Sequence, residues 1–293
     1  MAKLAFQDAL DNPVEIRTSS YAAILGLSPS KGARSPLLWN AAFKAAGLDA
    51  IMHPMDVRPE NLASVVAGLK ADARYLGGAV AVPHKQTIGS LLDRIEPEAE
   101  KIGAVNAIYR AGNQLVGANT DGAGALSQIE DLVGGAVALK AKHVTLIGVG
   151  GAGIAVAAFL ADRTAGLRIA NRTYSVAEEA ARRLGADPAA MPLAHEMLAK
   201  TDVLVNCTTV GYQDGPDGSP VPVEALAHLP EEAAVYDIIY QPRETPLLKA
   251  AAAHGFATRD GLGMNLDQAV IAWSKANPGT LTLEAVRVAM SAV

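Results

Sequence analysis

Short apolar segments alternate with longer amphipathic segments through the first 120 residues. The short segments have the length of strands, and the longer ones repeat apolar residues at helical spacing. The predicted strands are Tyr21–Leu27, Ile51–Pro54, Gly78–Val82 and Ala104–Tyr109, and the predicted helices are Pro36–Ala46, Pro59–Ala71 and Lys85–Leu92. Strands that alternate with helices in this way predict βαβ units and a largely parallel sheet.

A second region with the same alternation follows the boundary segment Gly117–Gly122, where Thr120 or Asp121 is placed to cap a helix. Its predicted strands are Val144–Ile147, Leu167–Ala170, Val203–Asn206 and Val235–Ile239, and its predicted helices are Ile154–Ala161, Val176–Leu184 and Pro246–Ala253. Two more helical patterns follow, one that ends near Lys275 and one over Leu283–Met290.

The last two helices bring no strand of their own, so we expect them to pack against the first region. The sequence therefore predicts an α/β protein with two domains. The first is discontinuous, comprises residues 1–120 and 262–293, and contains a mostly parallel sheet. The second comprises residues 121–261.

The clearest motif lies where the first strand of the second region ends. Gly148, Gly150 and Gly153 match G-x-G-x-x-G, which binds a dinucleotide when it joins a strand to a helix. The first glycine permits the tight turn, the second lets the backbone approach a pyrophosphate, and the third lets the helix pack closely. Gly151 and Ala152 belong to the same turn, at the helix N-terminus that receives the pyrophosphate. The second domain is therefore predicted to be of the Rossmann type.

Residues 144–161 are almost entirely apolar, which raises a membrane-spanning helix as an alternative. Four glycines in the middle of this run favour a strand, a turn and a helix instead.

The end of the next predicted strand indicates which nucleotide binds. NAD-binding domains place Asp or Glu there to accept a hydrogen bond from the ribose 2′-hydroxyl. This chain has Asn171, Arg172 and Thr173, a cation and donors that suit a 2′-phosphate. The sequence therefore predicts NADP as the cofactor. The alternative is that Arg172 is a solvated residue without a ligand.

Composition narrows the classes of function. A net charge of −5 gives no basic surface for nucleic acid, and the first residues contain no apolar signal segment. The single cysteine, Cys207, excludes an intramolecular disulfide and fits a reducing cytoplasm. The histidines lack metal-ligand spacing, so no metal is expected. We expect a cytoplasmic protein, monomeric or homodimeric, that acts on a small molecule and has no nucleic-acid or membrane partner.

Oxidation of an alcohol needs a group that exchanges the hydroxyl proton. Lys85 follows a predicted strand end, where open α/β sheets bind ligands. Burial disfavours the charged form of a lysine, which makes proton exchange near neutral pH easier. Asp121 is the natural partner, because a carboxylate orients an ammonium group. The alternatives are a solvated lysine at a helix start and an aspartate that caps a helix.

A series of short motifs, in order along nearly the whole chain, resembles the shikimate dehydrogenase family. Each motif is short, but their order makes the set specific. They are Arg34–Pro36, Val82–Lys85, Gly103–Asn106, Asn119–Gly122, Gly148–Ala152, Asn171–Thr173, Asn206–Gly211, Asp237–Tyr240 with Thr245 and Pro246, and Asp260–Met264 with Gln268.

The resemblance implies that the first domain binds the substrate and the second binds NADP. It implies that Lys85 and Asp121 form the catalytic pair. Further residues would contact the substrate, namely Ser35, Asn106, Tyr240 and Gln268. Further cofactor contacts would come from Cys207, Thr208, Gly261 and Met264. Taken without the resemblance, three of these residues are equally well explained as a turn asparagine (Asn106), a core tyrosine (Tyr240) and a surface glutamine (Gln268).

The chain departs from the family pattern in the predicted substrate pocket. Ala33 stands at the first serine of S-x-S-P, while Ala79 and Ala81 stand at the asparagine and threonine of N-V-T-x-P. In the family these groups hold the carboxylate and ring hydroxyls of the substrate. Each lost hydrogen bond to a charged partner costs about 1.5–3 kcal/mol. The pocket is therefore predicted to be altered, although the catalytic pair is kept.

Two further departures affect neighbouring positions. The segment Gly26–Gly32 is one residue longer than the family pattern, and Ser28, Ser30 or Lys31 are candidate replacement donors. Val176 stands where many relatives carry a second arginine, which predicts a somewhat weaker phosphate site.

The sequence as a whole predicts an NADP-dependent oxidoreductase of the shikimate dehydrogenase type, an activity of aromatic amino acid biosynthesis. It would interconvert a ring alcohol and a ketone on a small, carboxylated cyclic polyol, with shikimate and 3-dehydroshikimate as the default pair. One alternative is a paralogue that acts on quinate, aminoshikimate or another cyclic polyol, which the three alanines favour. Another is a non-catalytic dinucleotide-binding regulator, against which the retention of Lys85 and Asp121 argues.

Overall fold

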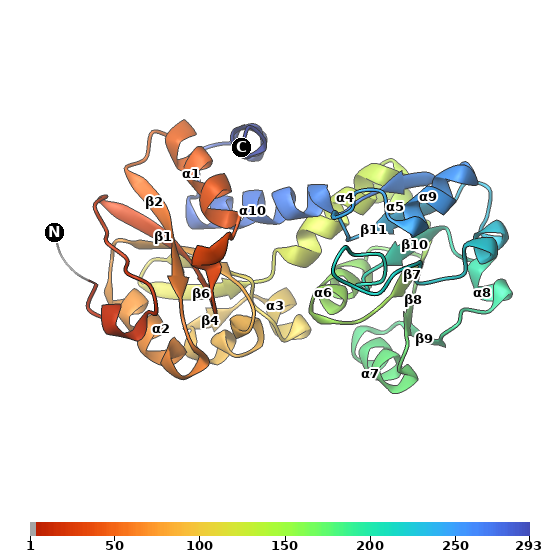
Figure 1. The fold of residues 1–293 in the computed structure, drawn as a ribbon, viewed down its shortest axis with the longest axis horizontal. Coiled ribbons are helices and arrows are strands. Elements are labelled where there is room, and N and C mark those ends of the chain that lie inside the picture. Colours follow the sequence, from red (N-terminus) through yellow and green to blue (C-terminus); the bar gives the residue numbers. More distant parts are fainter. Residues whose placement is uncertain (1–3) are drawn as a thin grey trace. The chain divides into compact units, whose positions relative to one another are not determined.

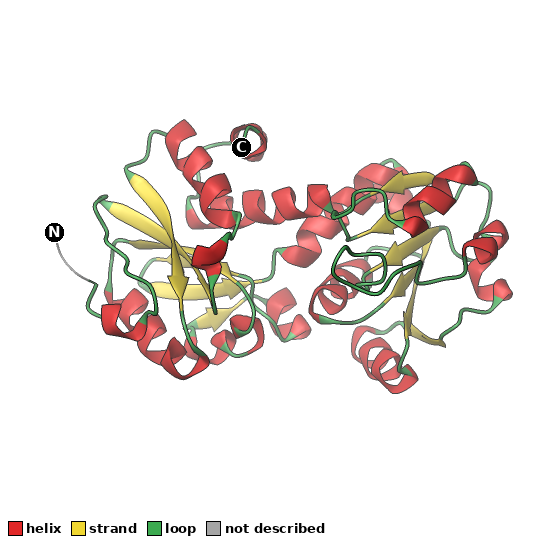
Figure 2. Cartoon of the chain, in the orientation of Figure 1, coloured by secondary structure: helices red, strands yellow, loops and turns green. Residues whose placement is uncertain are grey.

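The computed structural model describes residues 4–293, and the chain divides into two compact units, each an α/β layered structure (Figures 1 and 2). The first unit comprises the residues up to Thr120 together with Leu266–Val293, and the second comprises Asp121–Asn265. The chain passes from one unit to the other between Thr120 and Asp121 and again within helix α10 (Leu262–Ala276).

The first unit contains a six-stranded sheet in the order β2-β1-β3-β5-β6-β4. The pairs β1–β2, β1–β3 and β4–β6 are parallel, whereas β5 runs antiparallel to β3 and β6. The strands are β1 (Ser20–Gly26), β2 (Ala50–Asp56), β3 (Tyr75–Val80), β4 (Arg94–Ile95), β5 (Ala107–Ala111) and β6 (Gln114–Ala118). Besides α10, the helices are α1 (Ser35–Ala45), α2 (Leu62–Ala71), α3 (Pro97–Ile102) and α11 (Leu283–Ser291).

Alternate side chains of β1 point into two separate cores, because successive residues of a strand face opposite sides of the sheet. Ala23 and Leu25 belong to the core under α2. Ala22 and Ile24 belong to the core on the other face, which α1, α10 and α11 complete. Both buried tryptophans of the chain, Trp39 and Trp273, lie in that second core. The two C-terminal helices are therefore part of the first unit's packing.

The second unit contains a six-stranded parallel sheet in the order β12-β11-β10-β7-β8-β9, with the switch of direction between β7 and β10. This is the doubly wound order of dinucleotide-binding domains. The strands are β7 (His143–Ile147), β8 (Gly166–Asn171), β9 (Asp187–Ala190), β10 (Val203–Asn206), β11 (Ala234–Asp237) and β12 (Ala257–Arg259). The helices are α4 (Asp121–Val133), α5 (Ala136–Leu139), α6 (Gly151–Leu160), α7 (Tyr174–Leu184), α8 (His195–Leu198) and α9 (Pro246–Ala253).

The predicted helix over Lys85–Leu92 is wrong, because this segment forms two short 3₁₀ helices, His84–Gln86 and Ile88–Leu91. Gly89 and Thr87 disfavour a continuous α-helix there, since both residue types have low helix propensity. The hairpin β5–β6 also differs from the prediction, which had a single strand. Gly112, at φ +60°, supplies the left-handed turn between its two strands.

The apolar run 144–161 folds as β7, a turn and α6, as the glycines predicted. Across residues 4–293, no helix is long and apolar enough to cross a membrane.

Candidate active site

The glycine-rich turn connects β7 to α6 at the switch point of the second unit's sheet. Gly148 has φ +93° and donates its N–H to the carbonyl of Ala170 over 2.8 Å. A Cβ on Gly153 would lie 1.9 Å from the carbonyl oxygen of Gly148, so only glycine allows this approach. A Cβ on Gly150 or Gly151 would meet no atom within 4 Å. The first turn of α6 therefore faces open space, into which a pyrophosphate fits.

The end of β8 lies beside this turn. The Oδ1 atom of Asn171 accepts the N–H of Val149 over 3.4 Å, and its Nδ2 atom donates to the carbonyl of Thr173 over 3.1 Å. Asn171 thus joins the glycine-rich turn to the segment that follows β8. Arg172 and Thr173 are exposed. No acid occurs between Asn171 and Val176, so the position of an NAD-selective carboxylate is filled by a cation and a hydroxyl.

Cys207 and Thr208 follow β10 on the other side of the switch point. A Cβ on Gly148 would lie 2.6 Å from Cγ2 of Thr208, so the threonine methyl lies directly against the glycine-rich turn. Burial, together with the nearby charge of Asp237, raises the pKa of the Cys207 thiol. The thiol therefore stays protonated, and Cys207 is a packing residue at this edge rather than a nucleophile.

A buried carboxylate lies behind Thr208, and sequence reasoning gave it no role. Asp237, fully buried at the end of β11, accepts hydrogen bonds from the side chains of Asn206 and Thr245 over 3.0 and 2.8 Å. It also accepts the N–H of Ile239 over 3.1 Å. Burial raises the pKa of Asp237 to about 6 even though these donors oppose the shift. An acid that ends a buried strand was the signal in the sequence that pointed to this network.

Tyr240 lies half-buried in the loop after β11. Gly261 fastens that loop, since its N–H donates to the carbonyl of Ile239 over 3.0 Å. A Cβ on Gly261 would lie 1.8 Å from the carbonyl oxygen of Ile238, which explains the glycine. Met264 is buried in the unit's core.

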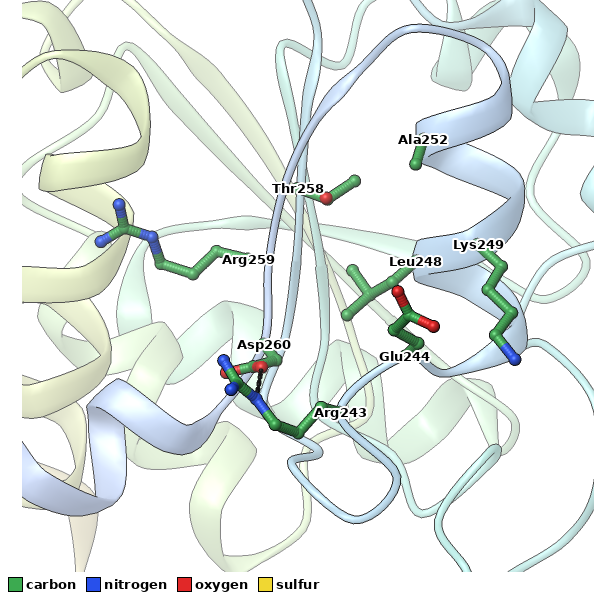
Figure 3. A pocket seen from close by; sticks show the side chains of 8 residues that line it. All are labelled: Arg243, Glu244, Leu248, Lys249, Ala252, Thr258, Arg259 and Asp260. Carbon is green, nitrogen blue, oxygen red and sulfur yellow. Dashed lines mark hydrogen bonds and ion pairs between the residues drawn. The ribbon is translucent and has the colours of Figure 1, made fainter.

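A cavity of about 580 Å³ lies between α9 and β12 (Figure 3). An ion pair of 2.7 Å between Arg243 and Asp260 crosses its lower end, and the cavity contains none of the predicted site residues. Its lining combines three cations with two carboxylates. The lining residues are Arg243, Glu244, Leu248, Lys249, Ala252, Thr258, Arg259 and Asp260.

In the first unit, Lys85 lies half-buried in the 3₁₀ turn that follows β3. Its carbonyl accepts the N–H of Val105 over 2.7 Å. The neighbouring His84 is only 1% exposed, and its Nε2–H donates to the carbonyl of Val57 over 2.8 Å. The tautomer follows from the partner, because a carbonyl only accepts. His84 therefore fixes the turn that carries Lys85 to the end of β2.

Asn106, Thr120 and Gln268 meet at the same edge. The Oδ1 atom of Asn106 accepts the N–H of Thr120 over 2.6 Å, and its Nδ2 atom lies 3.5 Å from Oε1 of Gln268. Thr120, fully buried, is the residue directly before Asp121, which begins α4. The sequence had suggested Thr120 only as a helix cap, whereas the structure gives it a partner in the predicted site.

Ala33, Ala79 and Ala81, the three departures from the family pattern, are half-buried and pack against the core that contains Trp39. Ser30, a candidate replacement donor, is already engaged, because its hydroxyl donates to Asp56 over 2.5 Å and its N–H does so over 2.9 Å. The hydroxyl of Ser30 already donates its proton to the end of β2, so it is not available as a donor to a substrate.

The predicted site residues divide between the units. The first unit holds Ser35, Lys85, Asn106 and Gln268, and the second holds Asp121, Tyr240 and the predicted cofactor contacts. Within the described part of the chain, no three His, Cys, Asp or Glu side chains are grouped so as to hold a metal ion.

Comparison with known proteins identifies both halves of the chain. Residues 26–108 match the family model described as the shikimate dehydrogenase substrate binding domain, and residues 131–211 match that of shikimate / quinate 5-dehydrogenase. The NADP(+)-dependent shikimate dehydrogenase of Symbiobacterium thermophilum is 38% identical over 263 residues, which are 85% of this chain and 87% of that protein.

Two solved structures share the fold. Shikimate 5-dehydrogenase from Thermus thermophilus, in complex with NADP(H) and shikimate, is 29% identical with a TM-score of 0.76, and 93% of this chain and 99% of that chain are covered. The ligand-free 5-ketofructose reductase of Gluconobacter sp. strain CHM43 is 32% identical with a TM-score of 0.80, and 94% and 99% of the two chains are covered.

The doubly wound sheet, its glycine-rich turn and the NADP-dependent relatives define the class of the protein as an NADP-dependent dehydrogenase with two α/β domains. The chain belongs to the shikimate dehydrogenase family. The predicted fold class, family and cofactor are thereby confirmed.

Proposed function

We propose that this enzyme interconverts a ring alcohol and the corresponding ketone, with shikimate and 3-dehydroshikimate as the default pair. The observation that carries the proposal is the glycine-rich turn beside an exposed Arg172, in a chain whose relatives are NADP-dependent shikimate dehydrogenases. The bound cofactor supplies or accepts the hydride.

Three groups of residues would hold the cofactor. The pyrophosphate would lie on the N-terminus of α6, where the open space beside Gly150 and Gly151 supports it. The 2′-phosphate would lie at the end of β8. The proposed contacts are Gly148, Gly150, Gly151, Ala152 and Gly153 for the first group, Asn171, Arg172 and Thr173 for the second, and Cys207, Thr208, Gly261 and Met264 for the remainder.

Lys85 would give or take the hydroxyl proton, and Asp121 would orient it. The anchoring of the Lys85 turn by His84 and Val105 supports this role, because a proton-transfer group has to be held in place. Ser35, Asn106, Tyr240 and Gln268 would hold the substrate. In this proposal residues 1–120 and 262–293 form the substrate domain, and residues 121–261 form the NADP domain. A cytoplasmic monomer or homodimer is the proposed state.

A second candidate substrate follows from the alanines. Ala33, Ala79 and Ala81 place methyl groups against an apolar core. The family pattern that the chain resembles implies a hydroxyl, an amide and a hydroxyl at these positions. A pocket that lacks these donors favours a ring compound without shikimate's polar pattern, such as another cyclic polyol or a keto-sugar of the 5-ketofructose kind.

The test is a substrate panel assayed by the absorbance of NADPH. It contains shikimate, quinate and aminoshikimate, each with NADP or NAD as the oxidant, and 5-ketofructose with NADPH or NADH as the reductant. We expect turnover with NADP rather than NAD. Activity on shikimate should be weak, with a KM higher than that of an enzyme with the full family pattern. Another compound of the panel should be turned over better. A protein that binds NADPH but turns over no member of the panel would support the regulator instead.

A further inference from the structure

One buried carboxylate joins the two loops of the second unit that carry proposed cofactor and substrate contacts. We propose that Asp237 is a positioning residue that couples the Thr208 loop (residues 207–216) to the Tyr240 loop (residues 238–245). Cofactor affinity and substrate affinity then depend on each other through this one group. The inference rests on the proposed roles of Thr208 and Tyr240.

The hydrogen bonds form a continuous series that ends on Asp237 from both sides. On the cofactor side, the N–H of Val210 donates to Oγ1 of Thr208 over 3.1 Å, and Thr208 donates to Oδ1 of Asn206 over 2.8 Å. The amide group of Asn206 then donates to Asp237. Its orientation is fixed, because the N–H of Thr208 also donates to Oδ1 of Asn206 over 2.9 Å.

On the substrate side, the series begins at the N-terminus of α9. The N–H of Leu248 donates to Oγ1 of Thr245 over 3.3 Å, which leaves the hydroxyl proton of Thr245 to donate to Asp237. The N–H of Ile239, one residue before Tyr240, donates to the same carboxylate. Every donor points toward Asp237, so the carboxylate sets the direction of the whole series.

The two loops are in contact at a second place as well, where the N–H of Gln213 donates to the carbonyl of Gln241 over 2.9 Å. Gln241 follows Tyr240 directly. The Thr208 end of the series lies against the glycine-rich turn, as the position of its methyl group beside Gly148 shows. A displacement of either loop is therefore transmitted to a residue that the proposed function uses.

The experiment measures effects across the series rather than at the mutated loop. Thr245→Val keeps the shape of the side chain but removes both its hydrogen bond to Asp237 and the one that it accepts from the N–H of Leu248. It lies outside the Thr208 loop, yet we expect it to raise the Kd for NADPH, measured by fluorescence titration without substrate, by about fivefold. Reciprocally, Thr208→Val should raise the KM for the best substrate of the panel at saturating NADP. The kcat of Thr245→Val should stay within about threefold of that of the unmodified enzyme, because Thr245 is none of the proposed catalytic, substrate or cofactor contacts.

Two controls separate coupling from a general loss of packing. Thr145→Val removes the buried 2.7 Å hydrogen bond between Thr145 and Thr201 of the same unit and should change neither constant. Thr245→Ser keeps the hydroxyl and should restore NADPH affinity. In an Asp237→Asn background, the effect of Thr245→Val on NADPH should shrink, since the carboxylate that joins the loops is gone.

Normal NADPH affinity in Thr245→Val, together with a normal substrate KM in Thr208→Val, would overturn the coupling while leaving the proposed function intact. An equal loss of NADPH affinity in Thr145→Val and Thr245→Val would also overturn the coupling. An unmodified enzyme that fails to bind NADPH would overturn the proposed function and this inference with it.

Discussion

Single side chains at the ends of β3 and β8 decide proton transfer and cofactor choice in the proposed mechanism. Arg172 is the simplest to test. Its replacement by alanine removes a charge-assisted phosphate contact worth about 1.5–3 kcal/mol, so the KM for NADP should rise about tenfold to a hundredfold. The KM for NAD should not change, because NAD has no 2′-phosphate.

Steady-state kinetics with both cofactors measure the effect of Arg172→Ala. Arg182→Ala is the matched control, since Arg182 is an exposed arginine of α7 that pairs with Glu179 over 2.7 Å. An unchanged KM for NADP in Arg172→Ala would show that Arg172 is merely solvated.

Lys85→Ala should lower kcat by about 10²–10⁴, the usual contribution of a positioned proton-transfer group. The Kd for NADPH should stay the same, because Lys85 belongs to the first unit and lies outside the glycine-rich turn. Lys44→Ala, at an exposed position of α1, is the control. Near-normal turnover in Lys85→Ala would exclude it as the acid–base group.

The raised pKa of Asp237 predicts how the stability of the folded protein depends on pH. Burial raises its pKa to about 6 in the folded protein, above the 3.8 of an ordinary aspartate. The folded state therefore binds this proton more tightly than the unfolded state does. The resulting stabilisation is complete below pH ~4 and is lost as the pH rises through 6, by about 3 kcal/mol.

Asp237→Asn has no such titration and supplies the comparison. The difference in unfolding free energy between the unmodified protein and the variant should fall by that amount between pH 4 and pH 7, measured by urea unfolding. A difference independent of pH would contradict the raised pKa.

At the scale of elements, the carboxyl end of β3 is expected to set the polarity of the proposed substrate pocket. The double substitution Ala79→Asn and Ala81→Thr returns an amide and a hydroxyl to half-buried positions at this end. The KM for shikimate should fall about tenfold, as two regained hydrogen bonds of ordinary strength imply. Ala46→Ser adds a hydroxyl to the same core away from the strand end and serves as control. An unchanged KM would indicate that the longer loop 26–32 already supplies the donors.

Elements with strong local signals could be predicted from the sequence. The β7–turn–α6 segment follows from glycine geometry and a run of apolar residues, both of which are local. Gly89 and Thr87 were a local sign against a long helix after Lys85, but the position of the 3₁₀ turn could not be predicted, because His84 hydrogen-bonds to Val57, which lies 27 residues away. Ser30 looked available for the substrate for the same reason, since its partner Asp56 lies 26 residues further along the chain.

The candidate site also combines local features, which the sequence reveals, with contacts between distant residues, which it does not. The sequence supplied the residue types of the Asp237 network as separate motifs, but the hydrogen bond between Asn206 and Asp237 joins the neighbouring strands β10 and β11 and appears only in the folded sheet. Single-strand patterns carry no information about which polar groups meet across a sheet.

At the scale of the whole molecule, the distribution of tryptophan separates the two units. Trp39 and Trp273, the only two tryptophans of the chain, are both buried in the first unit. The second unit carries all the proposed cofactor contacts and has cores of its own. Tryptophan fluorescence therefore reports on the first unit, whereas far-UV circular dichroism reports on the helices and strands of both.

NADPH at 100 times its Kd should stabilise the unit that holds it by about 2.7 kcal/mol. Because each unit has its own cores, we expect NADPH to move the urea midpoint seen by circular dichroism further than the midpoint seen by tryptophan fluorescence. Arg172→Ala, at the same NADPH concentration, should give a smaller shift, since its weaker binding lowers the saturation. Equal shifts of both midpoints would show instead that the continuous helix α10, which holds Met264 in one core and Trp273 in another, makes the two units unfold as one.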